Sequence, residues 1–238
     1  MNKNIITPIA SEIKSRLQQL GSPEDALFLQ RFFKTAPGQY GYGDIFIGVR
    51  VPDNRKLLSQ YRNLTLPDII PLLVSPIHEE RLFALIAMVS IFEKGDESAR
   101  KDVYLLYLNH TAYINNWDLV DISAPKIIGA FLSDKSREPL YQLVHSKSLW
   151  ERRIAILATF YFIRNNQFHD TLALAEILLL DKEDLMHKAS GWMLREVGKR
   201  NQQLEENFLK QHCRQMPRTM LRYAIEKFPA ELRLMYMR

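Results

Sequence analysis

Apolar residues recur at helical spacing along most of this chain, and no segment shows the sustained alternation that is typical of a β-strand. From residue 66 onward, five segments each begin with a polar cap and a charged residue and continue as an apolar helix. These segments cover residues 78–94, 117–132, 150–164, 186–200 and 217–228. Shorter apolar helical segments lie between them, such as residues 103–108 and 172–180. The pattern therefore predicts an all-α fold.

The five segments can be aligned on one charged position each, and these positions recur at a nearly constant period. They follow one another after 40, 32, 35 and 34 residues and are occupied by Arg81, Asp121, Arg153, Lys188 and Arg222. Helix pairs that recur at this period are typical of a curved α-solenoid of HEAT-like or armadillo-like repeats. Equivalent helices in such a stack line one concave surface, so we expect the five aligned side chains to lie along a single groove.

The chain is predicted to form a single domain over residues 1–238, in which an N-terminal part, residues 1–65, precedes the repeats. Residues 5–20 have an amphipathic helical pattern. The helix that follows is expected to carry Phe32 and Phe33.

A glycine-rich loop, residues 37–44, separates these helices from the next one. It lacks the Gly-Lys-Ser/Thr sequence of a phosphate-binding loop, so we interpret it as an ordered turn. Pro52 is placed to begin a helix, with Arg50 before it and Arg55 inside it. Arginines and backbone amides at a helix N-terminus could hold a phosphate, although an ordinary solvated helix end explains the same residues.

Local signals refine the predicted helix ends. Ser148 is placed to cap the helix of residues 150–164, and Asp181 is expected to begin another helix. Pro125 falls inside the segment of residues 117–132 and should kink it, because proline cannot donate the helical hydrogen bond.

Composition agrees with a soluble helical protein of considerable core size. Of the 238 residues 47% are apolar, whereas only 9 are glycine and 11 are proline. The single cysteine, Cys213, excludes an internal disulfide framework. Since no apolar run is long enough for a signal peptide or a membrane span, a cytoplasmic, nucleoid-associated protein is expected.

The net charge of +5 is unevenly distributed along the chain. Residues 1–145 contain 16 basic and 16 acidic residues, whereas residues 146–238 contain 16 basic and 11 acidic residues. The basic excess therefore belongs to the C-terminal part. A modest excess alone is weak support for a nucleic-acid partner.

The arrangement of the cations on predicted helices strengthens that interpretation. Lys188, Trp192, Arg195 and Lys199 are spaced by four, three and four residues, which gives one basic helical face containing an indole ring. A second stripe at intervals of four residues consists of Arg214, Arg218 and Arg222. Such stripes can neutralise backbone phosphates, although each stripe alone could be an ordinary solvated helix face.

Candidate chemistry lies at the beginning of the segment of residues 117–132. Trp117 and Asp121 are four residues apart, so a helix places the aromatic ring and the carboxylate on the same face. Asp118 is expected to point away from that face. A half-buried tryptophan beside a carboxylate at a helix start is the simpler alternative explanation.

Three segments together resemble the AlkD-type DNA alkylation repair glycosylases. They are Trp117-Asp118-Leu119-Val120-Asp121, residues 150–157 (WERRIAIL) and residues 191–196 (GWMLRE). Residues 48–52 (GVRVP) also resemble the N-terminal part of that family. The resemblance extends over nearly the whole chain and implies a curved stack of HEAT-like repeats that removes positively charged alkylated purines, such as 3-methyladenine and 7-methylguanine, from duplex DNA.

The resemblance also implies individual roles. Asp121 matches the catalytic carboxylate, Trp117 and Trp192 match the tryptophans that flank the sugar of the lesion, and Arg153 matches a neighbouring groove arginine. The DNA-binding positions that follow from the resemblance and from the basic stripes are Phe32, Arg50, Arg55, Lys188, Arg195, Lys199, Arg218 and Arg222. One departure concerns Asp184 and Leu185, since some family members have two adjacent phenylalanines there.

Together these features predict a DNA glycosylase that acts as a monomer on duplex DNA containing alkylated purines, with no metal, no other cofactor and no membrane partner. The six histidines have no metal-ligand spacing. Two alternatives stay open. One is a non-catalytic HEAT-repeat protein that binds DNA, and the other is an α-solenoid adaptor for protein partners.

Overall fold

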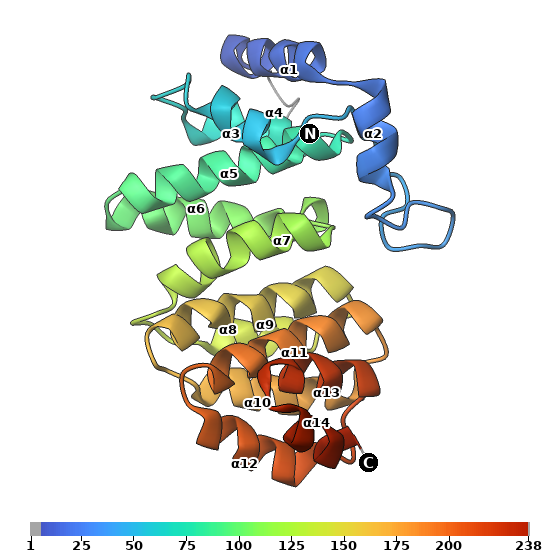
Figure 1. Cartoon of the computed structure of the whole chain (residues 1–238). Coiled ribbons are helices and arrows are strands. Elements are labelled where there is room, and N and C mark those ends of the chain that lie inside the picture. The colour runs from blue at the N-terminus through green and yellow to red at the C-terminus, as the bar shows by residue number, and fades with distance from the viewer. Residues whose placement is uncertain (1–5, 238) are drawn as a thin grey trace. The chain divides into compact units, whose positions relative to one another are not determined.

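The structure is a computed structural model that describes residues 6–237. Within these residues the chain forms fourteen α-helices and no β-strand, with one isolated parallel bridge between Ile45 and Ile77 (Figure 1). The prediction of an all-α fold is therefore confirmed. Among the same residues, no helix combines the length and the apolar character needed to cross a membrane.

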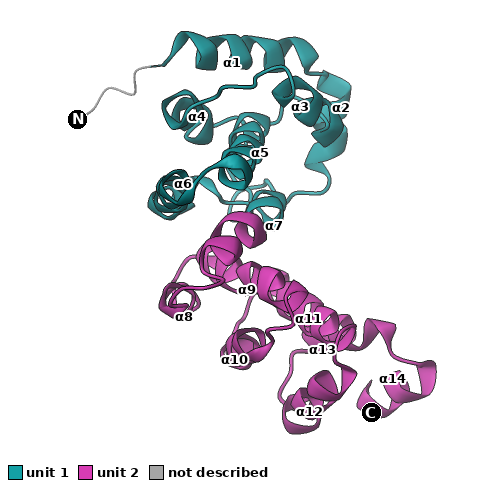
Figure 2. Ribbon diagram, turned by 90° about the vertical axis from the view of Figure 1, so that its left-hand side faces the viewer, with its two compact units in different colours: residues 1–123 teal, residues 124–238 magenta. Residues whose placement is uncertain are grey.

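The chain divides into two compact units, residues 1–123 and residues 124–238 (Figure 2). The division falls within one helical segment, which begins as α7 at Trp117 and continues as a π-helical turn, Pro125–Gly129. That a single domain spans residues 1–238 stays a prediction.

Unit 1 is built around one buried helix. Its α-helices are α1 (Pro8–Leu20), α2 (Pro23–Gln30), α3 (Val51–Leu58), α4 (Leu66–Leu73), α5 (His78–Lys94), α6 (Glu97–Asn109) and α7 (Trp117–Ala124). Helix α5 is buried on nearly every face, because α1, α3, α4 and α6 all pack against it. Burial on all sides explains why its apolar residues are almost continuous rather than confined to one stripe.

Unit 2 repeats a pattern of paired helices. Its α-helices are α8 (Glu138–Leu143), α9 (Leu149–Arg164), α10 (His169–Ile177), α11 (Asp184–Gly198), α12 (Gln202–His212), α13 (Arg218–Ala224) and α14 (Ala230–Met237). The π-helical turn packs on α9, α9 packs on α11, and α11 packs on α13.

Glycines permit two of these close approaches. A Cβ atom at Gly129 would lie 2.2 Å from the carbonyl oxygen of Ala158, and one at Gly191 would lie 2.3 Å from that of Met220. Both positions bring a helix directly against the backbone of its neighbour, which a larger residue would prevent. The same device at two places supports the predicted helical repeats.

Most predicted segments coincide with observed helices. The predicted segment of residues 78–94 is α5 itself, and Ser148 caps α9 by accepting a hydrogen bond from the backbone N–H of Glu151. Pro125 begins the π-helical turn, which accommodates the missing N–H of proline. The predicted start of the first helix, Ile5, lies outside the described residues.

Two local predictions are wrong. Helix α2 ends at Gln30, so Phe32 and Phe33 lie in the turn after it rather than on the helix. Asp181 does not begin a helix either, since α11 begins at Asp184. Asp181 instead forms an ion pair with Arg152, at 2.6 Å between Oδ2 and Nε.

Candidate functional site

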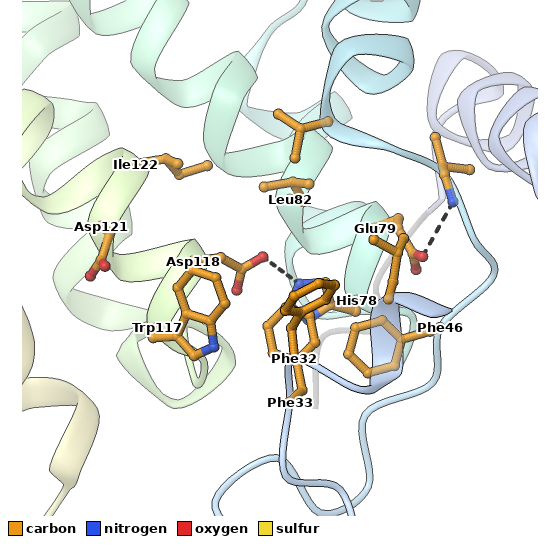
Figure 3. A pocket seen from close by; sticks show the side chains of 13 residues that line it. Phe32, Phe33, Phe46, His78, Glu79, Leu82, Trp117, Asp118, Asp121 and Ile122 are labelled. Carbon is orange, nitrogen blue, oxygen red and sulfur yellow. Dashed lines mark hydrogen bonds and ion pairs between the residues drawn. The ribbon is translucent and has the colours of Figure 1, made fainter. Parts of the chain in front are cut away.

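A cavity of about 310 Å³ opens in unit 1 between the turn after α2, the N-terminal ends of α3 and α5, and the first turns of α7 (Figure 3). We call it the aromatic pocket. Its rings are Phe32, Phe33, Phe46 and Trp117, and its remaining apolar lining is Leu29, Val49, Val51, Leu82 and Ile122. Its ionisable lining residues are His78, Glu79, Asp118 and Asp121.

Trp117 and Asp121 both line this pocket, as their spacing of one helical turn predicts. Trp117 is the first residue of α7, and the side chain of Asn116 accepts a hydrogen bond from its backbone N–H at 3.0 Å. The ring of Phe33 stacks on the indole, with 5.3 Å between centroids and 18° between planes. The stacked rings of Trp117 and Phe33 therefore form an aromatic wall of the pocket, and Asp121 adds a half-buried carboxylate.

His78 lies beneath the aromatic wall and joins two carboxylates. Its Nε2 atom is 2.7 Å from Oδ2 of Asp118 (Figure 3), and its Nδ1 atom is 3.2 Å from Oδ2 of Asp44. A carboxylate oxygen can only accept, so both ring nitrogens must donate, and the ring is an imidazolium. Phe46 stacks on the same ring, with centroids 4.7 Å apart.

The pKa values of this buried group follow from its partners. Burial by itself lowers the pKa of His78, but the charge of Asp118 and the hydrogen bonds to Asp118 and Asp44 outweigh burial and raise the pKa to about 9. Burial raises the pKa of Asp44, yet the hydrogen bond from His78 and the guanidinium of Arg81 bring it below its usual value. His78 and Asp44 are therefore both charged at neutral pH.

Glu79 closes the side of the pocket next to α3. Its carboxylate accepts backbone N–H groups of Ile47, Gly48 and Val49, the shortest at 2.8 Å from Gly48. Gly48 has a φ of +83°, and a Cβ atom there would lie 2.1 Å from the carbonyl oxygen of Ser22. Only glycine fits this position, which fixes the loop that carries Phe46 and Val49.

The expectation that Asp118 points away from Asp121 is wrong. Both side chains line the aromatic pocket, and Asp118 forms the ion pair with His78. Three residues along a helix correspond to a turn of about 300°, which equals about 60° in the opposite direction. Asp118 therefore lies on an adjacent face and belongs to the site.

The expectation that Arg81 lies in a groove is also wrong. The residue is 3% exposed, its Nη2 atom is 2.6 Å from Oδ1 of Asp44, and its Nη1 atom donates to the carbonyl of Ser75. Arg153, at the equivalent position of α9, is 5% exposed and donates to the carbonyl of Leu185 at 2.7 Å. Both arginines therefore have structural partners within their own units.

Helix α11 and the residue that caps its C-terminal end, Lys199, carry the predicted stripe of cations, which is interleaved with acids. Lys188 lies 2.8 Å from Asp184, and Lys199 lies 2.6 Å from Glu196. Glu196 also accepts a hydrogen bond from Nε1 of Trp192 at 3.1 Å.

Arg195 completes this stripe and forms an ion pair with Glu226. The face is thus a network of alternating charges.

The other predicted DNA-binding residues lie on exposed surface. Arg50 pairs with Asp25 at 2.6 Å, Arg218 donates to the carbonyl of Met237, and Arg222 donates to Thr219. The two remaining predicted residues, Arg55 on α3 and Phe32 in the turn after α2, are also exposed. Their contact with DNA stays a prediction.

Several pocket residues were absent from the sequence prediction, namely Phe33 as the partner of Trp117 and the group of Asp44, His78 and Asp118. Asp44 and His78 are 34 residues apart, and His78 and Asp118 are 40 residues apart. The one available signal was the spacing of Trp117, Asp118 and Asp121 on a single helix. Among residues 6–237, no group of three or more His, Cys, Asp or Glu side chains is arranged to hold a metal ion.

Comparison with known proteins provides an independent view of the chain. A family model described as "DNA alkylation repair enzyme" matches residues 13–228. The fold is similar to a solved structure described as "Predicted DNA alkylation repair enzyme from Enterococcus faecalis", with a TM-score of 0.68 and 16% sequence identity. That match covers 88% of this chain and 97% of the other. A search of curated proteins found no match.

Proposed function

Because the chain belongs to the family of DNA alkylation repair enzymes, we propose that it is a DNA glycosylase that excises positively charged alkylated purines from duplex DNA. We take 3-methyladenine and 7-methylguanine as representative substrates. The observation that carries the proposal is that Trp117 and Asp121 line one aromatic pocket from a single helix, α7.

The chemistry of such a lesion requires little more than this pair of side chains. An alkylated purine already carries a positive charge, so its glycosidic bond is weakened and no acid needs to protonate it. The transition state resembles an oxocarbenium ion, as in the hydrolysis of other glycosides. A fixed carboxylate near the sugar carbon C1′ stabilises that cation and can orient the attacking water.

Asp121 is the group that we assign to this task. Asp118 forms the ion pair with the imidazolium of His78, and Asp121 is drawn on the other side of Trp117 (Figure 3). The indole of Trp117 adds a cation–π attraction to the developing charge and excludes water from one side of it.

The two units contribute different predicted residues to this function. Trp192 and Arg153 belong to unit 2, and their assignment to the catalytic site stays part of the proposal. Lys188 and Arg195 on α11, and Lys199 directly after it, are proposed to hold the DNA backbone.

A direct assay tests the proposal. The protein is incubated with duplex DNA containing 7-methylguanine, and the released base is measured by chromatography. Release of 7-methylguanine that depends on protein concentration supports a glycosylase. If the duplex is bound but no base is released, the chain is a DNA-binding repeat protein without this activity.

A further inference from the structure

The glycine-rich loop, residues 37–44, ends at Asp44 and places its carboxylate inside unit 1, beside the residue that precedes α7. The side chain of Asp44 is only 4% exposed. Gly41 makes this close approach possible, because a Cβ atom there would lie 2.9 Å from the carbonyl oxygen of Lys34 and 3.5 Å from Nδ2 of Asn116. The loop is therefore an ordered connection whose last residue contacts the start of the helix that carries Trp117 and Asp121.

Hydrogen bonds fix Asp44 against the start of α5. The next residue, Ile45, donates its backbone N–H to the carbonyl of Pro76 at 3.3 Å and accepts from the N–H of His78 at 2.8 Å. The carboxylate of Asp44 accepts from Nη2 of Arg81 at 2.6 Å and from Nδ1 of His78 at 3.2 Å. Both cations belong to α5, the buried helix around which unit 1 is built, so Asp44 is held by the most rigid part of the unit.

From this position Asp44 holds the residue that caps α7. Its Oδ2 atom accepts from Nδ2 of Asn116 at 3.0 Å, and Oδ1 of the same amide accepts from the backbone N–H of Trp117 at 3.0 Å. Asn116 is fully buried, and its carbonyl accepts the backbone N–H of Val120, which is a helical bond of the first turn. The amide of Asn116 therefore links Asp44 directly to the first turn of α7.

A second link to α7 runs through His78, whose side chain is 3% exposed. Its Nδ1 atom faces Asp44, and its Nε2 atom lies 2.7 Å from Oδ2 of Asp118 (Figure 3). Asn116 and Asp118 are the two neighbours of Trp117 in the chain. The buried pair of Asp44 and His78 thus holds the chain on both sides of the indole.

Building on the proposed glycosylase function, we propose that Asp44 is a positioning residue for base excision. Together with His78 it fixes the first turn of α7, which carries Trp117 and Asp121. Asp44 does not touch the reacting atoms. Its effect is on distance, because a displacement of about 1 Å at a reacting centre can slow a reaction about 10²-fold. A buried cluster of ions is a poor source of stability in itself, so its place at the start of α7 favours positioning over support of the fold.

The substitution Asp44→Asn tests this role and keeps the shape of the side chain. The amide oxygen should face the permanent cation of Arg81, so the amide nitrogen faces His78 and Asn116 and cannot accept from either. With enzyme in excess over a duplex containing 7-methylguanine, release of the base should slow by about 10–100-fold. The affinity for undamaged duplex should not change. A rate of release equal to that of the wild-type protein would overturn the proposal.

The matched control is Asp68→Asn, because Asp68 is another buried acid of unit 1 that caps a helix. It accepts from Oγ1 and the backbone N–H of Thr65 at 2.6 and 3.1 Å, at the start of α4, and does not line the aromatic pocket. Both variants should have a lower melting temperature than the wild-type protein. At a temperature where both are folded, only Asp44→Asn should slow release. Equal slowing by the two variants would mean that Asp44 supports the fold alone, and would overturn the proposal.

A double-mutant cycle tests whether Asp44 acts through Asp121. If it does, its loss matters little once the carboxylate of Asp121 has been removed. Asp44→Asn should therefore slow release much less in the Asp121→Asn protein than in the wild-type protein. The same fold-change in both backgrounds would mean that the two residues act independently, which would contradict a positioning role.

Asn116→Ala is a second variant, because removing one partner of a buried ion pair can prevent folding. It leaves Asp44 paired with Arg81 and His78 and removes only the link to Trp117. Release should slow in the same direction as for Asp44→Asn. A wild-type rate of release in the folded Asn116→Ala protein would contradict the link.

Fluorescence without DNA separates this proposal from the proposed function. The difference between each protein and its Trp117→Phe counterpart isolates the emission of Trp117. Asp44→Asn and Asn116→Ala should both shift this emission to longer wavelength and increase its quenching by acrylamide, because the indole is no longer held against the ring of Phe33. Unchanged emission of Trp117 in both variants would overturn the proposal. A failure of the proposed function would instead be seen as no release of base by the wild-type protein.

Discussion

The imidazole of His78 and the carboxylate of Asp118 lie 2.7 Å apart, and this contact joins the first residue of α5 to the first turn of α7. Trp117 precedes Asp118 directly, and Asp121 follows one turn later. The ion pair therefore fixes the part of α7 that carries both proposed site residues.

Protonation of His78 should make stability depend on pH. Its pKa is raised from 6.5 to about 9, so its contribution is complete below pH 6.5 and is lost as the pH rises through 9. The free energies of unfolding of the wild-type protein and His78→Gln should differ most at pH 6 and converge towards pH 9.5, by at most about 1.4 kcal/mol per pH unit. Urea titrations over this range measure the difference. A difference in free energy of unfolding that does not change with pH would contradict a charged His78. The control is His169→Gln, at an exposed histidine, which should change the free energy of unfolding little at any pH.

Glu205 provides a second pH dependence, in unit 2. Its carboxyl group packs against Gly198, where a Cβ atom would lie 1.6 Å from Oε2. Burial, and to a smaller extent the charge of Glu206, raise the pKa of Glu205 from 4.5 to about 8, although the charge of Arg195 lowers it. The folded protein is thus more stable when the carboxyl group of Glu205 is protonated and neutral. Its contribution is complete below pH 4.5 and is lost as the pH rises through 8.

Glu205→Gln keeps a neutral side chain of similar shape at every pH. It should match the wild-type protein near pH 4.5 and exceed it in melting temperature at pH 8.5, as measured by calorimetry. Glu231→Gln, at an exposed glutamate, is the control and should change neither value. A variant that is less stable than the wild-type protein at pH 8.5 would show that the charged carboxylate is stabilising instead.

The fold followed from the sequence because helix formation depends on local patterns. Apolar periodicity predicted α5 over residues 78–94, and Ser148 marked the start of α9 through a bond to a residue three positions away. The positions of Phe32 and Phe33 were missed because α2 ends early, at Gln30, before the turn that leads to the pocket. Helix propensity alone does not locate the C-terminal end of a helix such as α2, because packing of the following loop decides where the helix stops.

The candidate site was only partly predictable, for a different reason. Trp117 and Asp121 share one helix, so their spacing was sufficient to place them together. His78 meets Asp44 and Asp118 across 34 and 40 residues, and no local pattern encodes such contacts. Arg81 appeared equivalent to surface cations in the repeat alignment, yet its environment in the core is set by Asp44.

Binding to duplex DNA should be electrostatic. The cations of α11 already have carboxylate partners, so each phosphate contact exchanges one anion for another and remains sensitive to salt. The logarithm of the affinity should fall with the logarithm of salt concentration by about 0.9 per neutralised phosphate. Lys199→Ala should lower that slope by about one unit in fluorescence anisotropy titrations. Lys101→Ala, an exposed lysine on α6 outside the predicted interface, should leave it unchanged. A slope near zero for the wild-type protein would remove the basic face of α11 from the account.

The charge of the base should decide which lesions are removed. Since no general acid has been assigned beside Trp117, the base must be a good leaving group without protonation. We expect release of 3-methyladenine and 7-methylguanine, and none of uracil or normal purines, from otherwise identical duplexes under single-turnover conditions. Efficient release of uracil would reveal an acid that this account lacks.

In the proposed reaction, the carboxylate of Asp121 stabilises the sugar cation. Asp121→Asn keeps the shape of the side chain and removes its charge. Binding to undamaged duplex should stay the same or tighten, because an anion leaves a surface that meets phosphates. Asp134→Asn is the control, because Asp134 is exposed and does not line the pocket. Asp118 is not a suitable control, because it forms the ion pair with His78.

The most direct measurement is the rate of 7-methylguanine release with enzyme in excess over DNA, compared between the wild-type protein and Asp121→Asn. We predict that the variant is slower by about 10²–10³-fold, the effect of losing one focused electrostatic group. Equal rates would contradict the catalytic role of Asp121 and would favour a structural role for the pair of Trp117 and Asp121.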